Sequence, residues 1–419
     1  MKVLLPILAA LLVSALAPLR ADLLVQPHDR LLVGCEVPLD QGMVSVDIAA
    51  YFLMCQPVDG LTVIGSNVGE ENVEGFMRRV PTEIAAWSPT VVITSHGIDD
   101  AREGRDGKGY TFYHPLYLQQ QLDALKKIGV RTIILGSASA VDSSVPQGAI
   151  PAKTYNENLA AFRDLDRDLA TKANVPFVDI FGATFDTMNK AKKAFGDSYN
   201  FGGDRGRFLH RNAQLVMAWA FLKALGADGN IGTITVDLTA NTATGTPGQK
   251  IVSVQKGTVN VESTRYPYCF TTSPPYSPGV DVTSDIITQF PFNQDLNRYL
   301  LVVKGLTSPR VKVTWGAESR VFAAGDLAQG ENLAAAFAGH TPFDQVFGHV
   351  VDALWQQQLK QFIWNDSVIS HLDVLKQMAP GAPFDQLIAG IHDQDAKNGA
   401  GAKALMMPID HTIKIEPQP

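Results

Sequence analysis

A thiol and a carboxylate stand side by side at the end of the first short apolar run that follows the amino-terminal segment. The run covers residues 31–33 and leads into Gly34, Cys35 and Glu36. A short apolar run bounded by a turn residue is typical of a buried strand, and open α/β sheets place their sites at the carboxyl ends of such strands. Cys35 could act there as a thiolate nucleophile, and Glu36 could act as an acid or a base.

Further titratable residues follow a later strand or precede a later helix. Asp99 comes just after an apolar run, and Asp204 and His210 come just before a helical pattern. Carboxylates that converge at a crevice can do acid and base work on a glycosidic bond, and together with His96 or His210 they can hold a metal ion. The opposing interpretation is that Glu36 and Asp99 are solvated groups and that the histidines are not ligands.

Strand and helix patterns alternate through the first half of the chain. Runs that are nearly continuous in apolar or β-branched residues predict buried parallel strands at 31–33, 61–64, 91–95, 132–135 and 177–180. Apolar residues at helical spacing predict helices at 44–54, 73–87, 116–128, 155–173 and 214–225. These βα units predict a three-layer α/β/α sandwich with a doubly wound, flavodoxin-like parallel sheet over residues 22–227.

The pattern changes after residue 227. Thr, Val and Gly with alternating apolar residues predict a β-rich module over 228–325, followed by a helical carboxyl-terminal segment over 326–419. Its tail from residue 398 is rich in Gly, Ala and Pro, and we expect it to be loose. One face of the helical segment is apolar and predicts packing against the rest of the protein. That face carries Phe343, Val346, Phe347, Val350, Val351, Leu354 and Trp355.

Charge and the amino-terminal segment limit the partners and the compartment. The net charge is −7 and there is no basic run, which argues against a nucleic-acid partner. Residues 1–21 have the pattern of a signal peptide, with Lys2, an apolar stretch over 4–16 and Ala21 at the cleavage position. That stretch is shorter than a membrane span, and no later stretch approaches the ~20 apolar residues that a span needs. We expect a secreted, periplasmic or cell-surface protein without a transmembrane segment.

The chain has 3 cysteines, so at least one of them has no partner within the chain. Cys35 ends a strand, whereas Cys55 ends the helix that runs back to the opposite edge of the sheet. A helix of about ten residues spans ~15 Å, and a disulfide needs Cα atoms ~5.5 Å apart. We therefore expect no bond between Cys35 and Cys55, and the sequence leaves the state of Cys269 open.

The order and spacing of several segments resemble the SGNH or GDSL hydrolases, specifically larger secreted bacterial esterases with an added carboxyl-terminal module. The matching framework segments are 29–31, 88–93, 155–159, 175–179, 215–222 and, in the module, 295–306. The resemblance implies the same sandwich fold and, for the family, ester hydrolysis by a serine, a histidine and an aspartate. It also implies that Gly34, Asn67, Gly97 and the 204–210 loop meet at one end of the sheet.

The residues at the family's catalytic positions differ from its pattern. Where the family has the serine of Gly-Asp-Ser, this chain has Glu36, which cannot form the acyl-enzyme. Asn67 stands nearest to the oxyanion-hole glycine, and Asp99 replaces the asparagine that donates to the oxyanion. An ionised Asp99 would only accept hydrogen bonds and would repel negative charge.

The family's Asp-x-x-His motif is also not intact. Counting back without gaps from the last matching segment puts Arg205 and Phe208 at its two positions, with Asp204 and His210 close by. Four blocks differ together, which favours a catalytically inactive protein that binds a glycan, an acyl-ester ligand or another surface protein, or has a structural role. That reading predicts neither cofactor nor metal. The alternative is an active hydrolase with a non-standard site that uses Glu36, Asp99, His210 or Cys35.

Overall fold

The structure, a computed structural model, describes residues 22–36, 42–66, 68–103, 110–145, 150–203, 206–207, 209–270 and 283–418. The signal peptide predicted over residues 1–21 lies outside these ranges. Within them, no helix combines the length and the apolar character that crossing a bilayer would require.

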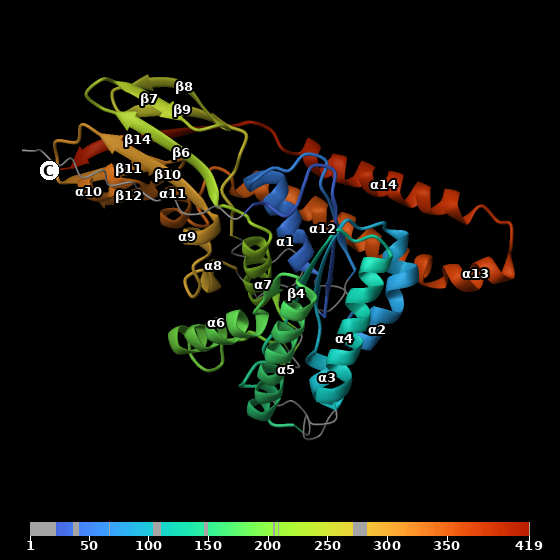
Figure 1. Ribbon diagram of the computed structural model, residues 1–419. Coiled ribbons are helices and arrows are strands. Elements are labelled where there is room, and N and C mark those ends of the chain that lie inside the picture. Colours follow the sequence, from blue (N-terminus) through green and yellow to red (C-terminus); the bar gives the residue numbers. More distant parts are fainter. Residues whose placement is uncertain are drawn as a thin grey trace, which may run out of the picture.

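A five-stranded parallel sheet forms the centre of the amino-terminal half (Figure 1). Its strands, in spatial order, are β2 (Thr62–Gly65), β1 (Arg30–Cys35), β3 (Val91–Ser95), β4 (Thr132–Gly136) and β5 (Phe177–Val178). The order 2-1-3-4-5 is that of the flavodoxin-like doubly wound sheets, whose switch point lies between β1 and β3. The predicted sheet is confirmed, and the carboxyl ends of β1 and β3 lie beside each other at its crevice.

Helices cover both faces of this sheet, because successive side chains of each buried strand point to opposite sides. Leu31 and Val33 of β1 pack into one hydrophobic core with the helices on one face of the sheet, and Leu32 packs into a second core with the helices on the other face. The helices are α1 (Met43–Ala50), α2 (Val73–Arg79), α3 (Ile98–Glu103), α4 (Tyr110–Lys127), α5 (Ala152–Ala173), α6 (Ile180–Phe195) and α7 (Arg211–Ala224). The three-layer sandwich is therefore confirmed.

Two predicted helices keep their bounds but change type along their length, and one predicted strand boundary is wrong. The helices expected over 44–54 and 73–87 begin as α1 and α2 but continue as π-helical turns over Tyr51–Cys55 and Val80–Ile84. Ile180, expected at the end of a strand, begins α6, because the side chain of Asp179 accepts a hydrogen bond from the backbone N–H of Gly182 and caps a helix there.

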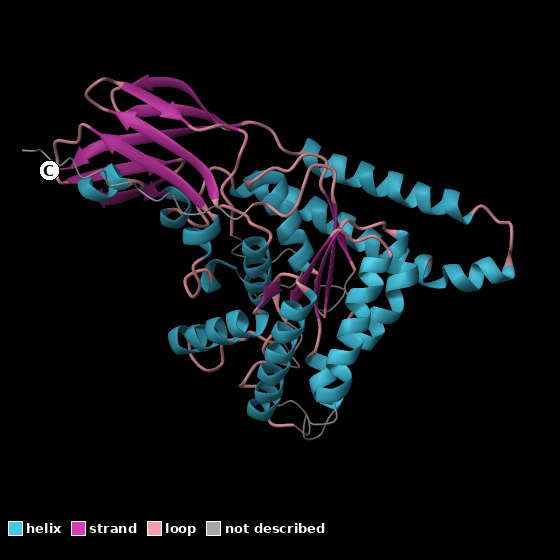
Figure 2. Ribbon diagram, in the orientation of Figure 1, coloured by secondary structure: helices cyan, strands magenta, loops and turns pink. Residues whose placement is uncertain are grey.

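The β-rich module consists of two further sheets that stand apart from the parallel sheet (Figure 2). One has the order β13-β10-β6-β7, and the other has the order β12-β11-β14-β9-β8. The strands are β6 (Asn230–Asp237), β7 (Thr242–Gly245), β8 (Gln249–Gln255), β9 (Thr258–Ser263), β10 (Arg298–Lys304), β11 (Arg310–Trp315), β12 (Glu318–Ala323), β13 (Glu331–Asn332) and β14 (Ile409–Gln418). Short helices α8 (Thr283–Ile286), α9 (Phe292–Leu296), α10 (Ala324–Gln329) and α11 (Leu333–Ala336) lie between them in sequence.

The tail expected to be loose is ordered, which corrects that expectation. Helices α12 (Asp344–Ser367), α13 (Leu372–Met378) and α14 (Phe384–Ala404) run out from the β-rich module and back again (Figure 1). The chain then enters the second sheet as β14, paired on both sides, with β11 and with β9. Its buried residues alternate at His411, Ile413 and Ile415, so this strand fills the centre of a sheet core. The end of the predicted helical segment thus belongs structurally to the β-rich module.

Helix α12 covers the edge of the parallel sheet at β2. The side-chain oxygen of Gln361 accepts the N–H of Gly65 at 3.0 Å, and its amide donates to the carbonyl of Val63 at 3.2 Å. One glutamine therefore bonds both backbone groups as a neighbouring strand would, which blunts an exposed strand edge. The apolar face predicted for this helix is confirmed, since its residues are buried or packed against the core.

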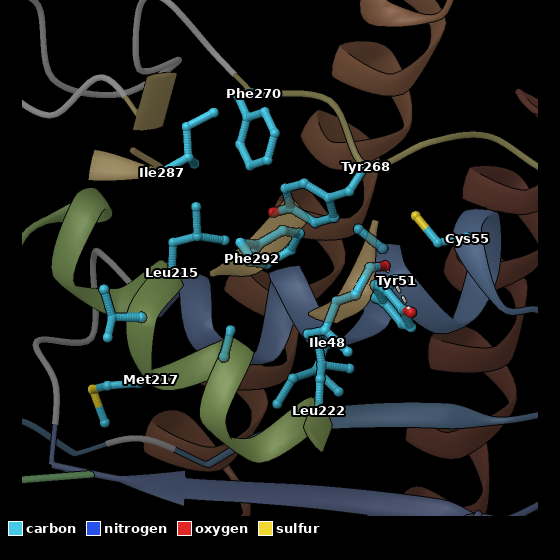
Figure 3. Close-up of a cluster of buried hydrophobic side chains, with 14 of the residues drawn as sticks. Ile48, Tyr51, Cys55, Leu215, Met217, Leu222, Tyr268, Phe270, Ile287 and Phe292 are labelled. Atoms are coloured by element: carbon cyan, nitrogen blue, oxygen red, sulfur yellow. Dashed lines mark hydrogen bonds between the residues drawn. The ribbon is translucent and has the colours of Figure 1, made fainter. Parts of the chain in front are cut away.

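An aromatic cluster joins the α/β domain to the β-rich module (Figure 3). The cluster contains Leu215 of α7, Phe292 of α9 and Tyr268, which follows β9. The ring centres of Tyr268 and Phe292 lie 4.9 Å apart. Tyr51 donates its hydroxyl to the carbonyl of Leu296 at 3.0 Å. The two parts of the chain therefore share a continuous core.

Candidate functional site

The candidate site lies where β1 ends beside β3. The backbone N–H of Glu36 donates to the carbonyl of Ser95 at 3.0 Å, which continues the β1–β3 pairing by one residue. Gly34 has no room for a side chain, because a Cβ there would lie 2.3 Å from the ring of Phe76. The strand end is therefore held closely, and Glu36 emerges from it next to the loop that follows β3.

The Glu36 carboxylate binds three successive backbone N–H groups at the start of α3. Its Oε2 accepts from Gly97 at 2.9 Å and from Ile98 at 2.8 Å, and its Oε1 accepts from Asp99 at 2.7 Å. Gly97 has φ +134°, a conformation that L side chains rarely adopt, and it allows the chain to turn directly from β3 into this helix. Glu36 therefore satisfies the N–H donors of this turn with its own carboxylate.

Glu36 and Asp99 are both buried, at 7% and 3% exposure, which excludes the interpretation that they are solvated groups. Burial raises the pKa of Glu36 well above its usual value, and the nearby Asp99 carboxyl raises it further, while the N–H of Asp99 acts in the opposite direction. Asp99 in turn contacts Arg207, whose guanidinium lies 3.4 Å from its Oδ1 and 2.8 Å from Oε1 of Glu70. The residue expected to repel an oxyanion is thus held in an ion pair.

A second buried set of charged residues surrounds Asp100, the neighbour of Asp99 on α3. His114 lies between two carboxyl groups, with its Nε2 2.8 Å from Asp166 Oδ1 and its Nδ1 3.4 Å from Asp100 Oδ1, and its ring stacks on Phe162. Burial alone would lower the pKa of His114, but Asp166 and Asp100 outweigh it and raise that pKa to about 10. A charged imidazolium therefore holds Asp100 in place, and Asp100 also accepts the N–H of Val73 at 3.2 Å.

The remaining predicted site residues are only partly described. Cys35 is a buried thiol whose pKa is raised by burial, which disfavours the thiolate that attack would need. His210 is the residue before α7, and its carbonyl accepts the N–H of Gln214. Asn67, Asp204 and Phe208 lie outside the described residues, as does Arg205.

The structure therefore brings Glu36 and Asp99 together, as the sequence predicted. Of the described residues in the 204–210 loop, Arg207 contacts Asp99. Among the residues that the structure describes, no three His, Cys, Asp or Glu side chains are arranged to hold a metal ion. All three cysteines are buried thiols.

Solved structures with a similar architecture include several enzymes. A gut microbial diltiazem-metabolizing enzyme superposes with a TM-score of 0.73 over 94% of this chain and 98% of its own, at 18% sequence identity. The chain has the fold of that enzyme. The other structural neighbours include a putative GDSL-like lipase from Parabacteroides merdae (TM-score 0.42, 15% identity, 49% of this chain and 99% of the lipase). They also include an acetylxylan esterase from Geobacillus stearothermophilus (TM-score 0.39, 16% identity, 48% of this chain and 96% of the esterase).

No protein-family model matches the sequence, and no curated protein is similar to it. A GDSL-like lipase is thus among the structural neighbours, as the predicted resemblance to the SGNH and GDSL hydrolases implied. At 18% identity, the likeness to the diltiazem-metabolizing enzyme is one of fold. Fold does not fix chemistry, so function has to be argued from the site itself.

Sequence reasoning missed Arg207, Tyr155 and His114 in this site. Tyr155 donates its hydroxyl to the carbonyl of Ile98 at 2.6 Å and so holds the turn that receives Glu36. Each of these residues acts through a partner far away in the sequence, and no local pattern marks such a pair. The local feature that could have indicated them is the acidic pair Asp99 and Asp100, because two adjacent carboxylates that become buried need cationic side chains nearby.

Replacing Glu36 with Gln is expected to lower the free energy of unfolding by about 2 kcal/mol. A glutamine offers one acceptor oxygen to three buried N–H donors, and its own NH2 then faces one of them. Urea unfolding of the purified protein measures this loss. The exposed Glu157→Gln on α5 is the matched control and should cost less than about 0.5 kcal/mol. Equal stability of Glu36→Gln and the unsubstituted protein would contradict the arrangement.

Proposed function

We propose that this chain is a secreted protein with the SGNH hydrolase fold that does not hydrolyse esters and that acts outside the cytoplasm by binding a ligand or by a structural role. The observation that carries the proposal is the Glu36 carboxylate on the N–H groups of residues 97–99. A carboxylate replaces the nucleophile, and it already occupies the donors beside it. No serine hydroxyl is left at this position to form an acyl-enzyme.

The two alternative chemistries have less support. A glycosidase needs one carboxyl group as acid and a second as base or nucleophile, both reaching the sugar. Here both oxygens of Glu36 accept backbone N–H groups, Asp99 contacts Arg207, and both residues are buried. A thiol mechanism needs a thiolate at Cys35, and burial raises the pKa of that thiol.

The location is proposed from residues 1–21, whose charge, apolar length and final alanine fit a signal peptide. The ligand is proposed to be a glycan, an acyl-bearing molecule or another surface protein. A glycan array probed with the purified protein distinguishes the first of these from the others.

The proposal is tested by hydrolysis of short acyl esters and by labelling with a fluorophosphonate probe. We expect the purified protein to show neither above background. Glu36→Ser should stay equally inactive, because nucleophile, base and oxyanion donors act as one unit and supplying only the hydroxyl leaves it unactivated. An active serine esterase run in parallel validates the probe, and circular dichroism checks that the variant is folded. Turnover by the unsubstituted protein that is lost on replacing Cys35 or His210 would overturn the proposal.

A further inference from the structure

A cavity of about 240 Å³ lies beside β2, at the edge of the parallel sheet. One wall comes from the chain between β2 and the π-helical turn over Val80–Ile84, and the other comes from α12 and the residues that follow it. The two walls are nearly 300 residues apart in sequence, as the hydrogen bond from the N–H of Gly65 to the side-chain oxygen of Gln361 on α12 illustrates. Its side chains include aromatic, aliphatic and acidic groups, and its cation is Arg79.

Arg79 cannot serve an anionic ligand, because its donors are already used. Its Nε and Nη2 bind the two oxygens of Glu71, each at 2.7 Å, and Nη2 also reaches the carbonyl of Ser66. Its Nη1 binds Ser66 Oγ and Glu83 Oε2, each at 3.2 Å. A guanidinium has five N–H donors, and these five bonds account for all of them.

More acidic than basic side chains line the cavity. Glu71 binds Arg79 through both oxygens, so Glu83 shares a cation whose charge is already matched. Glu83 is largely buried, with 15% of its side chain exposed, and Asp366 adds a second carboxylate to the lining. No lysine lies among the described residues that line the cavity. A ligand that enters therefore meets acceptors and negative charge.

The other lining residues suit an apolar body of limited size. Trp355 and Phe362 offer aromatic surface, and Leu359 lies between them in sequence on α12. Aromatic faces attract organic cations, by about 0.5–2 kcal/mol depending on how dry the site is. A volume of about 240 Å³ is below the range of drug-sized sites, so it fits one ring or a short chain.

We propose that this cavity binds a small organic ammonium ion, with the charged nitrogen on Glu83 and Asp366 and the apolar part against Phe362 and Trp355. The excess of carboxylates selects a cation over an anion, and the aromatic walls select an organic amine over a metal ion. The proposal does not rest on the absence of hydrolysis at Glu36, so each can fail without the other.

The test compares three probes of similar shape: 2-phenylethylammonium, 2-phenylethanol and 3-phenylpropionate. Titration calorimetry of the full protein at low salt should detect binding of the ammonium ion, with no heat from the alcohol or the acid at the same concentrations. Equal binding of the alcohol, binding of the acid, or no binding of the amine at millimolar concentration would each overturn the proposal.

Variants locate the binding. Glu83→Gln keeps an acceptor for Arg79. It should lower the affinity for the ammonium ion about tenfold, because one charge-assisted hydrogen bond is lost. Asp366→Asn, at an exposed position where folding is not at risk, should weaken it in the same direction. Asp373→Asn on α13 makes the same change of charge outside the cavity and should leave the affinity unchanged. Equal affinities in all three variants would place the amine elsewhere and overturn the proposal.

Discussion

Replacing Asp47 with Ala should lower the free energy of unfolding by about 4 kcal/mol, the typical cost of leaving one partner of a buried ion pair unpaired. Asp47 on α1 is fully buried and binds the guanidinium of Arg211 through both oxygens. Its Oδ1 also accepts the hydroxyl of Tyr268 at 2.6 Å. Burial raises the pKa of Asp47, and Arg211 opposes that rise, so removal of the carboxylate strands a cation in the core.

The same network joins three parts of the chain, since α1, α7 and the segment after β9 each contribute one residue. Urea unfolding followed by circular dichroism measures the loss. Tyr268→Phe removes only one hydrogen bond and should cost about 1 kcal/mol. The double variant Asp47→Leu with Arg211→Met should recover most of the loss, because no charge remains buried. A loss below about 1 kcal/mol for Asp47→Ala would show that Arg211 finds another partner.

Acidification should destabilise the β-rich module through His411. This histidine lies between the sheets, with Nε2 2.8 Å from Ser263 Oγ, and its Nδ1 accepts the indole N–H of Trp315 at 3.0 Å. An indole only donates, so the proton of the neutral ring is on Nε2, and the ring cannot act as a base toward Ser263. Burial lowers the pKa of His411 from 6.5 to about 4.

The direction of the effect follows from proton uptake. Between pH 6.5 and 4 the unfolded chain binds a proton at this residue and the folded chain does not, so stability falls as the pH falls. The full contribution of the neutral His411 ring to the free energy of unfolding is present above pH 6.5, and about 3 kcal/mol of it is lost by pH 4. The difference in unfolding free energy between the unsubstituted protein and His411→Gln should shrink by this amount across the window and stay constant from pH 7 to 8. Parallel curves, or an NMR titration of the folded ring near 6.5, would contradict the prediction.

Local patterns in the sequence were enough for most of the α/β half, although helices α3 and α6 were not predicted. Runs such as 91–95 are buried strands because a continuous apolar run cannot be left in water, and amphipathic stretches such as 155–173 are helices because their apolar residues recur at helical spacing. The strand β14 was missed although Ile409, His411, Ile413 and Ile415 alternate at the spacing of a strand. Its flanking Gly, Ala and Pro residues and its position near the chain end favoured a loose tail.

The sequence by itself determined that a glutamate and not a serine follows β1, because the apolar run of the strand and the residue after it can both be read without knowing how the chain packs. Only the tertiary structure decided what that glutamate does. Its carboxylate could have faced solvent, yet it is buried on three N–H groups of a turn more than sixty residues away in sequence. The pairing of Asp99 with Arg207 and the cavity between η3 (Val80–Ile84) and α12 likewise join distant segments. Periodicity reports which face of an element is buried, but the partner of a buried polar group is fixed by how whole elements pack.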